Sequence, residues 1–242
     1  MPTLLAKLDR RLLLMALAMV VSLGLLSAGL LAIATSLGNG ADLPSQGSIQ
    51  DILGNNSGDG GDLALTATAG PAVPPPPAPV RIAIPRVYVD APVVAMGLSD
   101  DSQPEVPDSA EQVAWYTFSA APGHSGNAVF SGHVDWITRS GDPIPGAFYR
   151  LRELEIGDSI NLQLDDGTQL LYRVTGNVAV PYDDPNVLKV MGAAEKDVVT
   201  LITCGGTWKK DYRAPFGGNY SHRIIVRAER VFGVAGGGAA GG

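Results

Sequence analysis

The pattern of apolar and polar positions divides the chain into a long uncharged run, a polar stretch and a region of short alternating segments. Residues 12–37 are 26 positions without a charged side chain. A helix needs roughly 20 apolar residues to cross a bilayer, whereas the apolar core of a secretory signal is shorter, roughly 7–15 residues. We therefore predict a transmembrane helix over 12–37. A cleaved signal peptide, cut near residues 32–34, is the alternative.

A basic cluster precedes this run. Lys7, Arg10 and Arg11 lie within residues 1–11. Basic residues next to a membrane span stay on the cytoplasmic side. We expect a single-pass protein of the cell membrane, with a cytoplasmic N-terminus and everything after the span outside the cell.

Two stretches lack any sustained period. Residues 38–79 are rich in Gly, Asp, Ser, Ala and Pro, and four consecutive prolines stand at 74–77. Such a composition buries too little apolar surface to offset the chain entropy, and a proline run favours an extended spacer. We predict a disordered linker over 38–79, which holds the next domain away from the membrane. The Gly/Ala tail, residues 233–242, is likewise predicted to be disordered.

The region 80–232 alternates over short segments and is long enough to bury a sizeable core. We predict strands over 81–85, 87–90, 127–131, 159–164, 169–174, 198–203 and 223–230. Asp166-Gly167 lies between two of them and predicts a hairpin. Helical periodicity is poor, with one short helix expected over 146–151. Many short strands with few helices indicate a mainly β barrel or sandwich.

Charge and composition limit the classes of function that the protein can have. The net charge is −7 and the sequence pI is about 4.9, which disfavours nucleic-acid binding. Three acidic pairs, at 100–101, 165–166 and 183–184, have the oxygen ligands that Ca²⁺ prefers. They stand in turn-like stretches where Asp is common. We predict no metal and no cofactor.

The only cysteine, Cys204, ends an apolar, β-branched run over 198–203 and is followed by two glycines. A lone cysteine cannot form an intramolecular disulfide. An inert buried thiol is the plain alternative, because free cysteine packs as a small apolar side chain. A nucleophilic thiolate needs a positive neighbour, and the candidates are His133 and Arg223.

Three motifs carry a resemblance to a known family. Residues 200–204 are Thr-Leu-Ile-Thr-Cys, Arg223 lies on the next predicted strand, and His133 follows a glycine upstream. This ordered set resembles the sortases, the cysteine transpeptidases of bacterial cell surfaces, over residues 80–232. The continuation Cys-Gly-Gly-Thr-Trp resembles class F, with class E as the near alternative. The resemblance implies a closed eight-stranded β-barrel with short helices.

The resemblance also implies the chemistry. Cys204 would cleave a Leu-Pro-x-Thr-Gly type sorting signal between Thr and Gly and form a thioester. An amine of a cell-wall precursor or a pilin lysine would then resolve the thioester. His133 would act as general acid and base, and the donor fork of Arg223 would suit the oxyanion. The partners would be secreted proteins with a C-terminal sorting signal. Two rival functions are an L,D-transpeptidase, which differs in the residues around its cysteine, and a non-enzymatic extracellular binding module.

Residues near these motifs are secondary candidates. Thr203 precedes the nucleophile and is predicted to bind substrate by ordering the oxyanion pocket, or else to pack within the strand. Trp208 and Trp136 could line a substrate groove, with packing as the alternative; of the two, we predict Trp208 for substrate binding. Asp135 follows His133 by two positions and could orient it.

Strand alternation separates the remaining basic residues. Arg223, Ile225 and Arg227 share one face of the predicted strand, whereas His222 points to the other. We expect replacement of Arg227 to matter far less than replacement of Arg223. His222 and His124, which lies in a glycine-containing loop, are predicted to be non-catalytic.

Overall fold

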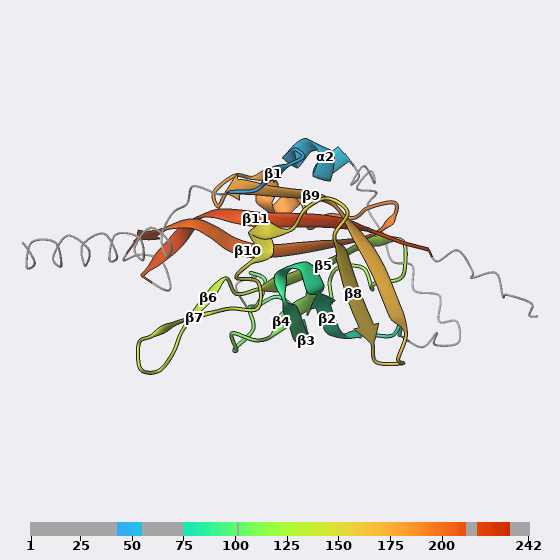
Figure 1. The fold of residues 1–242 in the computed structure, drawn as a ribbon, viewed down its shortest axis with the longest axis horizontal. Helices are drawn as coiled ribbons and strands as arrows, with labels where there is room; N and C mark the ends of the chain where they lie inside the picture. Colours follow the sequence, from blue (N-terminus) through green and yellow to red (C-terminus); the bar gives the residue numbers. More distant parts are fainter. Residues whose placement is uncertain (1–42, 55–74, 101, 212–216, 233–242) are drawn as a thin grey trace, which may run out of the picture. The chain divides into compact units, whose positions relative to one another are not determined.

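A computed structural model describes residues 43–54, 75–100, 102–211 and 217–232. Eight of its strands form a closed barrel in the order β9-β11-β10-β5-β4-β3-β2-β8, in which β8 pairs back onto β9 (Figure 1). The barrel strands are β2 (Pro79–Ile84), β3 (Val89–Met96), β4 (Val113–Tyr116), β5 (Gly126–Gly132), β8 (Ser159–Leu164), β9 (Gln169–Pro181), β10 (Asp197–Lys210) and β11 (Gly218–Arg230). The predicted mainly β, eight-stranded barrel is confirmed.

Short elements decorate the barrel. They are β1 (Ser45–Gln46), the two-stranded sheet of β6 (Asp135–Ile137) and β7 (Pro143–Pro145), the 3-10 helices η1 (Pro85–Val87) and η2 (Leu151–Glu153), and the helices α2 (Ile49–Gly54) and α3 (Asn186–Lys189). The short helix expected over 146–151 is displaced: residues 147–150 form turns, and the 3-10 helix η2 begins at Leu151. Strand β4 escaped prediction because all four of its residues are buried, so it shows no alternation.

Two apolar clusters lie on opposite faces of the barrel wall. The interior is filled by alternate residues of the strands, among them Phe130, Leu201 and Ile224. A second cluster lies on the outer face and includes Ile202 of β10 and Ile225 of β11. Strands β10 and β11 therefore bury both faces here, which explains the largely apolar, β-branched run over 198–203.

Part of the expected linker belongs to the barrel. Ser45 pairs with Val178, at the edge of β9, and α2 places Ile52, 3% exposed, in the outer cluster. Gln46 donates from Nε2 to the Leu154 carbonyl at 3.2 Å and accepts from the Ile156 amide at 2.9 Å. The prediction of a structureless linker over 38–79 is therefore wrong for residues 45–54, where an unpaired strand edge and an apolar patch give this segment a surface on which to order.

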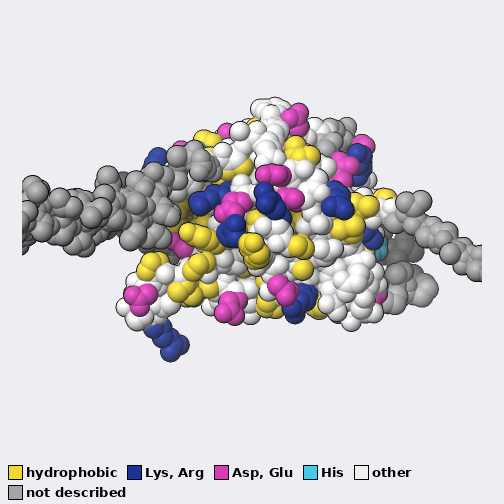
Figure 2. Space-filling model, viewed as in Figure 1, with side chains coloured by type: hydrophobic (Ala, Val, Ile, Leu, Met, Phe, Trp, Pro, Cys, Tyr) yellow, Lys and Arg dark blue, Asp and Glu magenta, His cyan; other side chains and the backbone are white. Residues whose placement is uncertain are grey.

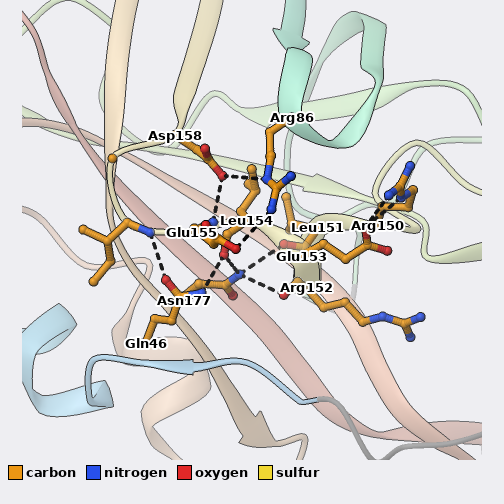
Figure 3. Close-up of polar contacts among 12 residues, drawn as sticks. Gln46, Arg86, Arg150, Leu151, Arg152, Glu153, Leu154, Glu155, Asp158 and Asn177 are labelled. Atoms are coloured by element: carbon orange, nitrogen blue, oxygen red, sulfur yellow. Dashed lines mark hydrogen bonds and ion pairs between the residues drawn. The ribbon is translucent and has the colours of Figure 1, made fainter.

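A buried amide holds η2 against the segment. Asn177 of β9 is fully buried, and its Nδ2 lies within hydrogen-bond distance of the carbonyl oxygens of Leu151, Arg152 and Leu154 (Figure 3). Leu154 also accepts from Gln46. Carbonyl oxygens at the end of η2 thus connect this helix to both β9 and β1. Without these hydrogen bonds, the carbonyl oxygens would need water as a partner.

Acidic and basic side chains are interspersed on the face in Figure 2. Arg86 pairs with Glu155 at 3.1 Å, and Arg150 pairs with Glu153 at 2.5 Å. These pairs are solvent-exposed and so add little to stability.

The predicted transmembrane helix over 12–37 and the tail over 233–242 lie outside the described residues and stay predictions. Within the described ranges, no helix combines the length and the apolar character needed to cross a membrane.

Candidate active site

Strand register brings the three main predicted residues together on three neighbouring strands: Cys204 and Arg223 lie in the middle of β10 and β11, and His133 directly follows the end of β5. Cys204 and Arg223 are paired positions of the antiparallel strands β10 and β11. Strand β5 runs parallel to β10, with Ser131 paired to Ile202. Two residues further along each strand are His133 and Cys204. Because residues two apart share a face, all three side chains belong to the outer face of the wall.

Burial dominates the electrostatics of the cysteine. Cys204 is half-buried, and this burial raises the pKa of its thiol. The positive charge of Arg223 opposes the rise in pKa, and the negative charge of Asp135 adds to it. The sulfur is therefore a protonated thiol at neutral pH, and attack requires that a proton first be removed.

Close packing around the backbone requires glycine at the two positions after Cys204. A Cβ at Gly205 would lie 2.7 Å from Ile224 Cδ1. Gly206 has φ +77°, and a Cβ there would lie 2.3 Å from Ser221 Oγ. The pairing of β10 with β11 shifts register between Gly205 and Trp208. Glycine thus lets the strand bulge directly beyond the nucleophile.

His133 is held from several sides. Its Nε2 donates to the Pro107 carbonyl at 2.7 Å, which leaves Nδ1 of a neutral ring as the site that can accept a proton. Trp136 packs against the imidazole with its ring 4.9 Å away, centroid to centroid. The His133 carbonyl accepts from the Phe148 amide at 2.9 Å, and a Cβ at Gly146 would lie 2.3 Å from that carbonyl oxygen.

The guanidinium of Arg223 is anchored by its own strand. Nη2 donates to Asn219 Oδ1 at 2.9 Å, and Nη1 donates to the carbonyls of His222 at 3.1 Å and Tyr220 at 3.4 Å. Its central carbon lies 5.8 Å from the centre of the Tyr182 ring. These contacts fix a positive charge next to the cysteine, where it favours the thiolate or an oxyanion.

The two predicted substrate-binding residues lie in different settings. Thr203 is 4% exposed, and its hydroxyl donates to the Gly132 carbonyl at 2.8 Å, so it joins β10 to the end of β5. Trp208 is 46% exposed and packs edge-on against Tyr220, with ring centroids 5.2 Å apart. Only Trp208 therefore offers a free surface to a peptide, and substrate binding by either residue stays a prediction.

One contact at the site was missed from the sequence. The phenol of Tyr220 donates to Asp135 Oδ2, so the carboxylate that was expected to orient His133 is bonded to β11 instead. Burial and the Asp135 carboxylate both raise the pKa of Tyr220. The sequence carries no signal for this pair, because 85 residues separate its members.

The other basic residues have different surroundings. His222 Nδ1 lies 2.8 Å from Ser221 Oγ, and His124 lies in the loop before β5. Arg227 shares the outer face with Ile225, as predicted, but it is only 1% exposed and donates to the carbonyls of Ile52 and Val190, each at 3.4 Å. Burial lowers the pKa of Arg227 to about 10. Replacement of Arg227 would open a buried site and destabilise the fold, whereas the expectation that it matters far less to the reaction than replacement of Arg223 stays a prediction.

The fold and the site together define a β-barrel with a cysteine, a histidine and an arginine at neighbouring positions of adjacent strands. The sortase-domain family model matches residues 82–231, and the chain belongs to the sortase family, whose members are cysteine transpeptidases. No curated protein matches the sequence.

Solved structures of sortases resemble the chain. A lid mutant of sortase A from Corynebacterium diphtheriae is 26% identical over 64% of this chain and 71% of that one, with a TM-score of 0.47. Sortase C-1 from Actinomyces oris is 27% identical over 63% of this chain and 73% of that one, with a TM-score of 0.45.

Proposed function

We propose that this protein is a membrane-anchored sortase that cleaves a Leu-Pro-x-Thr-Gly type sorting signal between Thr and Gly. Cys204 is the nucleophile, His133 the general acid and base, and Arg223 the oxyanion donor. Its clients are secreted proteins with such a signal at the C-terminus. The acceptor is an amine of a cell-wall precursor or a pilin lysine.

One observation carries the proposal. The β5–β10–β11 register brings His133, Cys204 and Arg223 to neighbouring positions on one face of the barrel wall, although the cysteine and the arginine follow the histidine by 71 and 90 residues in the sequence. Family membership favours this activity over an L,D-transpeptidase or a binding module. The Cys-Gly-Gly-Thr-Trp sequence supports class F over class E.

The chemistry follows from the groups present. His133 takes the proton from the Cys204 thiol, and the thiolate attacks the Thr carbonyl of the signal. Arg223 stabilises the resulting oxyanion with its planar donor fork. The His133 imidazolium then protonates the leaving Gly amine, and the C–N bond breaks to leave a thioester on Cys204. In the second step an amine attacks the thioester, His133 takes its proton, and the C–S bond breaks to restore the cysteine.

The test is capture of the thioester. The protein is mixed with a sorting-signal peptide, and its intact mass is followed in the absence of an acceptor. The expected result is a mass gain equal to the peptide up to Thr, lost on adding an amine and absent in Cys204→Ala. A stem tetrapeptide is the negative control. A mass gain that persists in Cys204→Ala, or that appears only with the tetrapeptide, contradicts the proposal.

Membrane anchoring has its own test. Because a basic cluster precedes the uncharged run 12–37, the barrel is expected outside the cell. Protease added to intact spheroplasts should remove it. Protection of the barrel would contradict this topology, and release of a soluble form without protease would indicate a cleaved signal peptide instead.

A further inference from the structure

We propose that Asp135, held in place by Tyr220, forms an anionic subsite that receives the positively charged acceptor amine in the second half of the reaction. This inference rests on the proposed sortase function and extends it to a residue pair that is not needed to form the thioester.

The first observation is the anchoring of the carboxylate. Asp135 begins β6, two residues after His133, whereas Tyr220 lies on β11, three residues before Arg223. The Tyr220 phenol donates to Asp135 Oδ2, so one carboxylate oxygen is fixed across the site. Tyr220 is itself packed against Trp208. A charged group on a short hairpin is thereby held at a fixed place next to the nucleophile.

The second observation concerns the ion-pair partners of Asp135 within the part of the chain that the structure describes. No lysine or arginine of the described residues forms an ion pair with Asp135. Its charge reaches the sulfur, since it raises the pKa of Cys204. A carboxylate that hinders ionisation of the nucleophile is a cost to the first half-reaction. We therefore expect Asp135 to assist a later step of the reaction cycle.

The third observation is the separation of charges around Cys204. The guanidinium of Arg223 is anchored by Asn219 and packs near Tyr182, at the β9 end of the site. Asp135 approaches from the β6–β7 hairpin, which belongs to a separate sheet. The sulfur thus has a cationic neighbour suited to an oxyanion and an anionic neighbour suited to an ammonium group.

The acceptor has the matching chemistry. A lysine amine has a pKa of about 10.4 and a peptide α-amine about 7.7–8.0, so both arrive largely or partly as ammonium ions. The Asp135 carboxylate binds the ammonium, and His133 removes one proton from it. The neutral nitrogen attacks the thioester carbonyl, the new C–N bond forms, and the C–S bond breaks to release the Cys204 thiolate. The ammonium has then lost two protons in all, one to His133 and one from the tetrahedral intermediate to solvent.

A first experiment measures the subsite without any sorting reaction. Methanethiosulfonate reagents that differ only in a trimethylammonium or a sulfonate group modify Cys204, and the ratio of their rates reports the local charge. Asp135→Asn removes the charge and keeps an oxygen that can accept from Tyr220. The cation-to-anion rate ratio should fall about fivefold in this variant. Asp108→Asn, in the loop beside Pro107, is the control for removal of a neighbouring carboxylate.

A second experiment separates the two half-reactions. Asp135→Asn should acylate faster than wild type below the pKa of Cys204, because removal of the negative charge favours the thiolate. The concentration of triglycine needed for half-maximal aminolysis should rise about tenfold, because the ammonium loses its partner. Hydroxylamine, which is uncharged at neutral pH, should resolve the thioester equally well in both proteins. Tyr220→Phe keeps the charge but removes its anchor, and should raise the triglycine requirement by a smaller factor of about three.

The outcomes are distinct. An unchanged reagent ratio together with an unchanged triglycine requirement in Asp135→Asn overturns the subsite. Equal losses of acylation, aminolysis and hydroxylamine resolution, with a lower melting temperature, also overturn it, because they indicate a purely structural role. If wild type forms no thioester with the sorting peptide, the proposed function fails, and the reagent ratio still decides whether Asp135 makes an anionic subsite at Cys204.

Discussion

The Thr203 hydroxyl donates to the Gly132 carbonyl oxygen at 2.8 Å, and each of these residues immediately precedes a candidate catalytic residue. Thr203 is followed by Cys204 on β10, and Gly132 is followed by His133 at the end of β5. One hydrogen bond therefore ties the middle of β10 to the end of β5, directly next to the nucleophile and its base.

Removal of this bond tests the positioning role. Thr203→Val keeps the shape but loses the hydroxyl, and should cost about 1–2 kcal/mol of unfolding free energy because the part-buried Gly132 carbonyl loses this donor. It should also slow acylation about tenfold, since small misplacements of reacting groups are costly. Single-turnover acylation and denaturant unfolding measure the two effects.

Thr200→Val is the matched control, because Thr200 lies on the same strand and its buried hydroxyl donates to Asn127 Oδ1 at 2.6 Å. It should lose stability but retain its acylation rate. Equal acylation losses in the two variants would show that general destabilisation, not the link at Gly132, is responsible.

Arg223 tests electrostatic catalysis. Arg223→Lys keeps the charge but loses the planar fork that reaches Asn219 and the backbone carbonyls, and acylation should fall about 10²–10³-fold. Arg223→Ala should lose at least as much, with the melting temperature little changed. Arg81→Lys, which loses an exposed two-point contact with Asp90, is the control for loss of the fork itself. Wild-type acylation in Arg223→Lys would show that the fork is dispensable.

The buried thiol gives a defined pH dependence. Because the pKa of Cys204 is raised in the folded protein, its contribution to stability is present below the unfolded pKa of about 8.5 and is lost as pH rises through the folded pKa. The difference in unfolding free energy between wild type and Cys204→Ala should therefore fall as pH is raised above about 8.5. Denaturant titrations between neutral and alkaline pH measure it. A difference that grows with pH would mean that the folded protein favours the thiolate.

The segment 45–54 should contribute to the stability of the barrel. Ile52→Ala removes a side chain that is 3% exposed, and should cost about 2–3 kcal/mol. Leu188→Ala on α3, where the leucine is 66% exposed, is the control and should change stability by less than about 0.5 kcal/mol. Thermal or denaturant unfolding measures both. Equal stabilities of Ile52→Ala and wild type would show that the segment is not part of the folded domain.

Local sequence pattern determined much of this protein. Alternation placed β8 at its observed bounds, and Asp166-Gly167 marked its turn to β9. The Thr-Cys-Gly-Gly motif, with His133 and Arg223, identified the family, since the sequence retains residue types that the chemistry requires. These features depend on interactions between near neighbours along the chain, or on residue types that can be read directly from the sequence.

Tertiary structure decided the rest. Burial of Arg227 depends on Ile52, 175 residues earlier, and the Asp135–Tyr220 bond joins residues 85 positions apart. The docking of residues 45–54 depends on an open edge of β9 that exists only once the barrel has formed. The periodicity and composition of a segment indicate which face of a strand is apolar, but they do not indicate which distant segment covers that face. Only the register of β5, β10 and β11 brings His133, Cys204 and Arg223 to one place, because strand pairing is set by long-range contacts.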